Sequence, residues 1–218
     1  MLAIFDLDDT LIHGDSAHLF TAFLHDQGLH PDPEARHKEG QFIEKYQNGS
    51  LNLEEYMQFS LLPLKGWNKK RLEIVVNAFV VEVIEPLICP AMKQRLDWHR
   101  QQQHRLLIIS ATGEHLVLPI AEALGVPDAL GIEVLWRDSA LTGEIGARRP
   151  FQAGKLEALK QWLSVQTTPL GTTWFYSDSH NDLPLLEQVD HPVAVNPDPQ
   201  LLARAQTAGW TILEGARL

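Results

Sequence analysis

Four short apolar runs, each ending in a polar turn, constrain the fold of this chain more than any other feature. The runs cover residues 2–5, 106–109, 172–176 and 192–195. Continuous apolar runs of this length fit strands that are buried on both faces of a parallel sheet. Segments with helical periodicity lie between and after them, at 91–102, 114–124, 153–163 and 201–207. This alternation predicts an α/β fold with a Rossmann-like, doubly wound parallel sheet.

One long stretch interrupts the alternation. Residues 14–83 hold no strand-like run, and helical periodicity covers 16–27, 33–47, 53–62 and 68–83. A block inserted after the first strand would lie above the edge where open α/β sheets bind ligands. We therefore predict an α/β catalytic core of residues 1–13 and 84–218 and an all-helical cap of residues 14–83. A small hairpin is expected at 132–136 and 140–145.

The composition narrows the function. The chain has 218 residues, with 18 Lys and Arg against 28 Asp and Glu, which gives a formal charge of −10. This charge disfavours binding to nucleic acids and to anionic membrane surfaces. The single cysteine, Cys89, excludes a disulfide scaffold. We see no apolar run near the ~18 residues of a membrane span and no leader pattern, so we expect a cytoplasmic protein.

Carboxylates gather where the predicted strands end. Asp6 and Asp8 follow the first run two residues apart, and such residues in extended chain project to one side. Asp178 and Asp182 follow the third run. In a parallel sheet these strand ends share one edge. Clustered carboxylates repel one another unless a cation neutralises them, and Mg²⁺ accepts a few carboxylates together with a substrate phosphate. The pattern predicts an Mg²⁺ site.

Groups that suit an anion accompany the carboxylates. Ser110 and Thr112 end the second run, and Lys155 begins a later helix. Hydroxyl groups and a lysine can hold phosphoryl oxygens, so the set fits phosphoryl transfer. Taken one at a time, residues such as Ser110 and Asp182 are more often helix caps, and a lysine such as Lys155 is more often solvated. Their occurrence together and in order at the predicted strand ends favours a phosphoryl-binding site. We interpret four further polar residues as turn formers or caps only: Asp9, Thr10, Asp138 and Asp198.

This pattern resembles the haloacid dehalogenase superfamily of phosphatases. The segment Asp-Leu-Asp-Asp-Thr-Leu at 6–11 resembles the nucleophile motif DxDxT. Ser110 and Lys155 resemble the second and third motifs, and Asp-Ser-His-Asn-Asp at 178–182 resembles the acidic fourth motif. The helical insert is similar to the cap of the phosphoserine phosphatase-like branch, subfamily IB.

The resemblance implies an Mg²⁺-dependent phosphomonoester hydrolase that acts on a small phosphorylated metabolite through an aspartyl-phosphate. Asp6 would be the nucleophile, and Asp8 the general acid and base. The resemblance implies that the catalytic residues are Asp6, Asp8 and Lys155. It implies that the substrate is bound by Ser110, Ala111, Thr112, Lys155, Asn181 and Asp15. It implies that the metal is bound by Asp6, by Asp178 and by Asp8 through its backbone carbonyl, with Asp182 as a weaker or indirect ligand.

The sequence departs from the phosphoserine phosphatases in the predicted cap. Ser60 stands where that branch carries an arginine for the substrate carboxylate, and residues 39–63 include no arginine. Asp15 stands nine residues after the nucleophile, where the branch carries a glutamate for the amino group. Asp15 would therefore bind a cationic group of the substrate, as in histidinol phosphate, or would only cap the helix that begins near Ser16. We interpret the aromatic residues of the cap as core.

Three alternatives remain open at this stage. The enzyme is specifically a phosphoserine or histidinol-phosphate phosphatase, or it returns the phosphoryl group to another alcohol as a phosphotransferase or mutase. From another class, the chain is a phospho-ligand sensor without catalysis. Intact aspartates at positions 6 and 8 disfavour the sensor. No motif fixes an oligomeric state.

Overall fold

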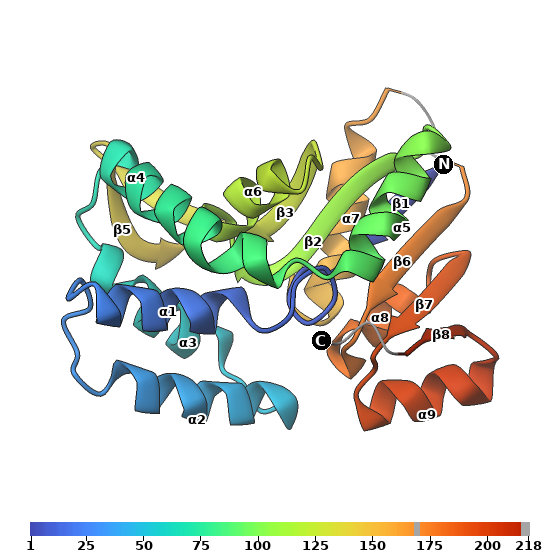
Figure 1. The fold of residues 1–218 in the computed structure, drawn as a ribbon, viewed down its shortest axis with the longest axis horizontal. Helices are drawn as coiled ribbons and strands as arrows, with labels where there is room; N and C mark the ends of the chain where they lie inside the picture. The colour runs from blue at the N-terminus through green and yellow to red at the C-terminus, as the bar shows by residue number, and fades with distance from the viewer. Residues whose placement is uncertain (168–170, 215–218) are drawn as a thin grey trace.

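The computed structural model describes residues 1–167 and 171–214. Its centre is a six-stranded sheet with the order β3-β2-β1-β6-β7-β8, in which every neighbouring pair is parallel (Figure 1). The strands are β1 Leu2–Phe5, β2 Arg105–Gly113, β3 Asp128–Ile132, β6 Thr173–Ser177, β7 His191–Val195 and β8 Thr211–Leu213. From β1 the chain adds β2 and β3 on one side of the sheet, and later β6, β7 and β8 on the other side of β1. The ends of β1 and β6 therefore flank the point where the strand order reverses, which is where such sheets bind ligands.

The alternation of side chains along β1 divides the core into two layers. Ala3 and Phe5 belong to one buried cluster, and Leu2 and Ile4 belong to the other. Helices α5 (Pro90–Gln101) and α6 (Glu114–Ala123) contribute to the first cluster. The helices of the second cluster are α7 Ala153–Ser164, α8 Leu183–Leu186 and α9 Pro199–Ala208. Burial on both faces explains why the strands read as continuous apolar runs.

The stretch between β1 and α5 is helical, as predicted. It holds α1 Ser16–Asp26, α2 Ala35–Gln47, α3 Leu53–Leu61 and α4 Lys69–Phe79, followed by a π-helical segment Val80–Ile84 and short 3₁₀ turns at Leu62–Leu64 and Glu85–Leu87. Asp15, Asn52 and Asn68 cap α1, α3 and α4 with side-chain oxygens that accept a backbone N–H. The predicted fold class, a doubly wound parallel sheet with an all-helical insertion, is confirmed.

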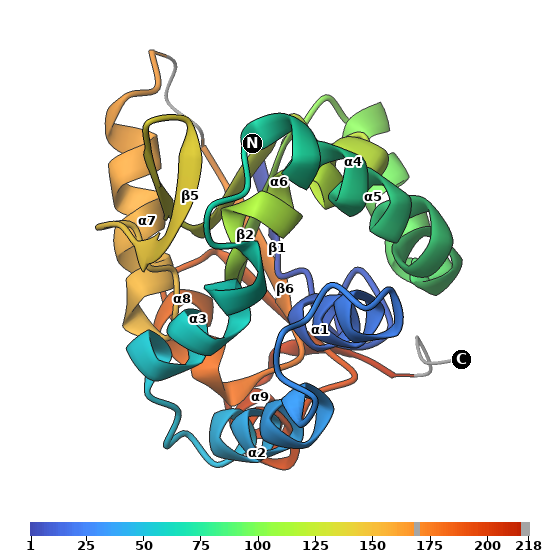
Figure 2. The same cartoon turned by 90° about the vertical axis from the view of Figure 1, so that its left-hand side faces the viewer.

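The two connections between the helical segment and the sheet run side by side. Ile12 and Ile88 form an isolated antiparallel bridge, and the N–H of Cys89 donates to the carbonyl of Leu11. The segment leaves and re-enters the sheet region at one place. Figure 2 shows α1, α2 and α3 grouped beside one another on the side of the molecule that also carries the β5 strand.

The hairpin is β4 (Val134–Arg137) paired antiparallel with β5 (Ala140–Ile145). It also contacts the helical segment, because the N–H of Gly66 donates to the carbonyl of Leu141 at 2.8 Å. Two sheet strands were missed. The short β3 contains Ile132, which was wrongly assigned to the hairpin, and the three-residue β8 lies at the edge.

No helix among the described residues is long and apolar enough to cross a membrane. Residues 168–170 and 215–218, which fall within the predicted core of 84–218, lie outside the described residues.

Candidate active site

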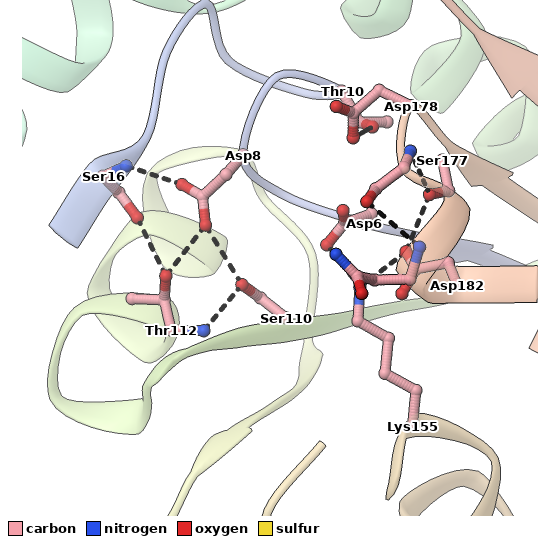
Figure 3. A network of polar contacts seen from close by, with 12 residues as sticks. Asp6, Asp8, Thr10, Ser16, Ser110, Thr112, Lys155, Ser177, Asp178 and Asp182 are labelled. Carbon is pink, nitrogen blue, oxygen red and sulfur yellow. Dashed lines mark hydrogen bonds and ion pairs between the residues drawn. The ribbon is translucent and has the colours of Figure 1, made fainter. Parts of the chain in front are cut away.

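The first acidic pair lies where β1 ends and the chain turns toward α1. The N–H of Asp6 donates to the carbonyl of Tyr176, so Asp6 continues the parallel ladder past the strand. Asp9 then adopts φ +51°, a left-handed conformation that asparagine and aspartate tolerate better than most residues. Asp6 and Asp8 line one cavity, as predicted, but their carboxylates contact different groups (Figure 3).

Asp6 contacts a buried lysine. The Nζ of Lys155 donates to Asp6 Oδ1 at 2.8 Å and to Asp182 Oδ2 at 2.7 Å, and only 1% of Lys155 is exposed (Figure 3). Burial alone lowers the pKa of Lys155, but the charges of Asp182 and Asp6 outweigh it and hold this pKa above its usual value. Lys155 is therefore a fixed positive charge, and it is not the solvated lysine of the simpler interpretation.

A tight turn places Lys155 at the start of α7. Gln152 adopts φ +51° just before the helix. A Cβ on Gly154 would lie 2.1 Å from the carbonyl oxygen of Arg149, so only glycine fits this position. From this position the lysine side chain reaches between the carboxylates of Asp6 and Asp182.

Burial dominates the electrostatics of Asp6. Burial, helped by the charge of Asp182 and opposed by that of Lys155, raises the pKa of Asp6 to about 7. Asp182 is fully buried, and its Oδ2 also accepts the hydroxyl of Ser177 at 2.7 Å. The Oδ1 of Asp182 is buried without a hydrogen-bond partner among the described residues.

Asp8 is held by the end of β2 and by the start of α1. Its Oδ2 accepts from Thr112 Oγ1 at 2.8 Å and from Ser110 Oγ at 3.2 Å. Its Oδ1 accepts the N–H of Ser16 at 2.7 Å. Burial raises the pKa of Asp8, and these donors partly oppose the rise. The arrangement fixes the orientation of Asp8 and favours a carboxyl that is protonated more readily than usual.

Asp178 lies across from Asp6 at the end of β6. Burial raises its pKa well above the usual value, and the charges of Asp6 and Asp9 add to the rise. The hydroxyl of Thr10 donates to Asp178 Oδ1 at 3.2 Å. Thr10 was interpreted as a turn former only, and that interpretation is wrong, since its side chain ties the Asp6 turn to Asp178.

The donor chemistry of this corner fits a hard cation. Burial and the charge of Asp6 raise the pKa of Asp178, and Asp182 Oδ1 is a buried oxygen without a hydrogen-bond partner among the described residues. Among the described residues, no three His, Cys, Asp or Glu side chains form a ligand set by themselves. Mg²⁺ keeps waters and takes few carboxylates, so the carboxylates at this corner suit it.

These groups open into a cavity of about 650 Å³, within the usual range for small-molecule sites. Seven of the predicted site residues line it: Asp6, Asp8, Asp15, Ser110, Ala111, Thr112 and Asp178. Lys155, Asp182 and Asn181 lie behind this wall. Asn181 donates to the backbone carbonyl of Tyr46 at 3.3 Å and accepts from Gln152 at 3.1 Å, so it links the fourth-motif loop to α2.

Asp15 combines both roles that the sequence left open. Its Oδ1 accepts the N–H of His18 at 2.8 Å and caps α1, and the residue also lines the cavity. Burial raises the pKa of Asp15 well above its usual value, and the charges of Asp8 and Glu39 raise it further. Ser60 does not line the cavity, and no lysine or arginine is found among the described residues that do.

The far wall of the cavity comes from α2 and α3 and was largely missed. Tyr56 belongs to the buried core and Phe42 packs against it, as predicted, but both also line the cavity, as Tyr46 does. Glu39, which also lines it, was not singled out. The missed signal was a carboxylate on the apolar face of a helix, one turn from Phe42 and from the buried Ala35.

His180, in the fourth-motif loop, also lines the cavity. Its Nδ1 lies 2.8 Å from Asp198 Oδ2, which also accepts its backbone N–H. Asp198 caps α9, as predicted, with its other oxygen. The pair holds the fourth-motif loop against α9.

Comparison with known proteins identifies the family. A family model of haloacid dehalogenase-like hydrolases matches residues 3–187, and the chain belongs to this family. A histidinol-phosphatase of Neisseria meningitidis serogroup C is 37% identical over 97% of both chains. A phosphoserine phosphatase of Mycobacterium tuberculosis is 28% identical over 96% of this chain and 69% of its own. Within the family, the chain is thus a phosphatase-type enzyme.

Solved structures agree on the fold. A Bordetella pertussis protein of unknown function is similar at a TM-score of 0.90, with 34% identity over 98% of this chain and 97% of the other. A phosphoserine phosphatase solved as a phospho-aspartyl intermediate analogue has a TM-score of 0.71 at 17% identity, over 99% and 94%.

Proposed function

We propose that this chain is an Mg²⁺-dependent phosphomonoesterase that works through a phosphorylated Asp6. The observation that carries the proposal is the separation of the two motif aspartates. Asp6 contacts Lys155, whereas Asp8 contacts the hydroxyls of Ser110 and Thr112, and both carboxylates line the same cavity. One carboxylate is thereby suited to attack phosphorus, and the other to exchange protons with the leaving oxygen.

In the first half-reaction, an oxygen of Asp6 bonds to phosphorus while the bond to the ester oxygen breaks. The proton on the Asp8 carboxyl goes to that oxygen, so the alcohol leaves neutral. Burial of Asp8 raises its pKa and so favours the protonated form that this step requires. Lys155 balances the charge of Asp6 and would contact the phosphoryl oxygens.

In the second half-reaction, Asp8 is a carboxylate and takes a proton from water. The water oxygen bonds to phosphorus, the bond to Asp6 breaks, and inorganic phosphate leaves. Asp6 is then a carboxylate and Asp8 is again protonated, so the cycle closes. Ser110 and Thr112 keep Asp8 in one orientation through both steps.

Mg²⁺ would supply charge neutralisation for the phosphoryl group. Asp6, Asp178 and the backbone carbonyl of Asp8 would hold it, and Asp182 would act through Lys155 or as a weaker ligand. The buried, unpartnered Asp182 Oδ1 supports a cation close by.

We also propose that residues 14–83 act as a cap on the core of residues 1–13 and 84–218. The adjacent connections at Ile12 and Ile88 support a common hinge. Contacts across the cavity support a closed form, since Arg149 pairs with Glu54 at 2.7 Å and Asn181 contacts Tyr46. A closed cap would exclude water while Asp6 attacks.

Histidinol phosphate is the first substrate to test. The 37% identical relative is named a histidinol-phosphatase. Asp15 offers a carboxylate to an ammonium group, whereas none of the described cavity-lining residues offers an arginine to a substrate carboxylate. That combination favours an ester that carries an amine and no carboxylate over phosphoserine, which carries both.

Phosphate release from a panel of esters tests the proposal. The panel contains histidinol phosphate, phosphoserine, phosphocholine, thiamine monophosphate and p-nitrophenyl phosphate, each with Mg²⁺ and with EDTA. We expect metal-dependent release that Asp6→Asn abolishes. The matched control is Asp138→Asn in the exposed hairpin turn, which should leave release unchanged. Activity that survives Asp6→Asn would refute the assigned nucleophile, and phosphate moved to another alcohol would indicate a phosphotransferase.

A further inference from the structure

The part of the cavity formed by α2 and α3 holds an acidic group that the phosphoryl chemistry does not use. Only 1% of the surface of Glu39 is exposed, yet the residue lines the cavity. Its Oε2 accepts the hydroxyl of Thr21 at 3.1 Å, and its Oε1 accepts the hydroxyl of Tyr56 at 3.2 Å. The two donors fix the carboxylate in one orientation and leave further lone pairs of both oxygens available.

The charge of Glu39 has no cationic partner. Seven carboxylates line the cavity, and the described lining residues include no lysine or arginine. Asp6 pairs with the ammonium group of Lys155, and Asp198 contacts the imidazole of His180. Asp15 and Glu39 have only neutral donors. Burial, and then the charges of Asp8 and Glu39, raise the pKa of Asp15, and burial raises the pKa of Glu39. A buried, uncompensated charge of this kind is unfavourable until a cation or an N–H donor binds.

Aromatic rings line the same cavity as this carboxylate. The rings of Phe42 and Tyr56 line the cavity with centroids 5.3 Å apart, and the hydroxyl of Tyr56 contacts Glu39 itself. Aromatic faces favour a planar ring or a cation. An aromatic wall and a carboxylate that accepts hydrogen bonds at its edge together suit a planar ring that bears an N–H.

We propose that Glu39 is a specificity-determining residue that binds an N–H-bearing, cationic heteroaromatic ring of the substrate, while Asp15 binds an ammonium group closer to the phosphate. The inference rests on the proposed phosphomonoesterase function and extends it. The preferred substrate is then a phosphomonoester whose alcohol carries two nitrogen groups. Neither group takes part in phosphoryl transfer, so Glu39 acts on binding of the alcohol and not on the chemical step.

Three esters separate the two nitrogen groups. Histidinol phosphate carries an ammonium and an imidazole, phosphoethanolamine carries an ammonium alone, and p-nitrophenyl phosphate carries neither. The readout is the ratio of kcat/KM for each amine-bearing ester to that for p-nitrophenyl phosphate. A charge-assisted hydrogen bond supports an expected loss of roughly 10- to 100-fold when its acceptor loses its charge.

Glu39→Gln keeps the shape of the side chain and removes its charge. We expect the histidinol phosphate ratio to fall by roughly 10- to 100-fold, mainly through KM, and the phosphoethanolamine ratio to change by less than about threefold. Asp15→Asn should lower both ratios. Glu44→Gln, the same substitution at an exposed position of α2, should change neither ratio. Glu39→Asp, which keeps the charge and shortens the side chain, should give an intermediate loss.

Other outcomes would contradict either the role of Glu39 or the proposed phosphatase function. Equal losses on all three esters, or no loss, would overturn the role of Glu39 while leaving the phosphatase intact. A changed Mg²⁺ requirement in Glu39→Gln without a changed ratio would mean that Glu39 serves the metal. A wild type that releases phosphate from none of the esters would refute the proposed function itself.

A binding measurement on the wild type keeps the inference testable if the variants do not fold. Free histidinol should compete with p-nitrophenyl phosphate at least about tenfold more tightly than ethanolamine does. Equal inhibition constants for the two alcohols would overturn recognition of the ring.

Discussion

Replacing Lys155 with methionine tests whether the lysine balances the buried charge of the site. Lys155 is 1% exposed and holds Asp6 and Asp182 at 2.8 and 2.7 Å. Methionine has a similar length and no charge, so the variant leaves two buried carboxylates without a cation. Breaking a buried ion pair in this way costs about 3–5 kcal/mol of folding free energy. For a chain of this size that corresponds to a fall in Tm of roughly 6–20 °C.

The pH dependence of the loss identifies its cause. With Lys155 in place, the pKa of Asp6 in the folded protein is about 7; without the opposing charge of Lys155, burial raises it further. The folded variant then binds more protons than the unfolded chain, so its stability increases as the pH falls. The loss relative to wild type should be smaller at about pH 5 than at about pH 8.

The assay is thermal unfolding in EDTA, since a bound cation would mask the missing charge. The matched control is Lys160→Met, an exposed position of the same helix, which should change stability by less than about 0.5 kcal/mol. Adding Asp182→Asn to the variant should recover about 1–2 kcal/mol, because it removes one of the unpaired charges. A loss that is equal at both pH values and unaffected by Asp182→Asn would refute the electrostatic explanation and indicate lost packing.

Three further outcomes are expected. Asp8→Asn should lower steady-state turnover by about 10²- to 10⁴-fold, and p-nitrophenyl phosphate should then give a burst of product, because its leaving group needs no proton while the second step still needs the base. Thr112→Val removes a donor that lowers the pKa of Asp8, so the pH–kcat profile should move to higher pH. Asn181→Ala should loosen the link to Tyr46 and raise KM more than it lowers kcat, measured by steady-state kinetics. An unchanged pH profile in Thr112→Val would contradict the role of Thr112 as a donor to Asp8. An unchanged KM in Asn181→Ala would contradict the role of Asn181 as a link to α2.

The sequence was most informative where local pattern and chain topology agree. β1 was placed at its observed bounds because Leu2–Phe5 is buried on both faces and gives an uninterrupted apolar run. The polar turns after β1, β2 and β6 had to meet, because parallel strands share one carboxyl edge. The short β3 was missed since Asp128 and Gly131 interrupt its apolar run.

Side-chain direction was less accessible to sequence reasoning. From their spacing alone, Asp6 and Asp8 were predicted to project to the same side of the chain. The spacing did not reveal that the two carboxylates contact different partners. Thr10 bonds a residue that is 168 positions away in the chain, which no local pattern indicates. Glu39 was overlooked because its two hydroxyl donors come from other helices, so its burial depends on tertiary packing.

The most direct test of the central claim is the location of the phosphoryl group on the enzyme. Asp8→Asn should trap the phosphorylated form, because it lacks the base for the second step. After reaction with p-nitrophenyl phosphate and an acid quench, peptide mass spectrometry should find one added phosphoryl group on Asp6. A phosphoryl group on a different residue, or an unmodified enzyme during turnover, would contradict the mechanism.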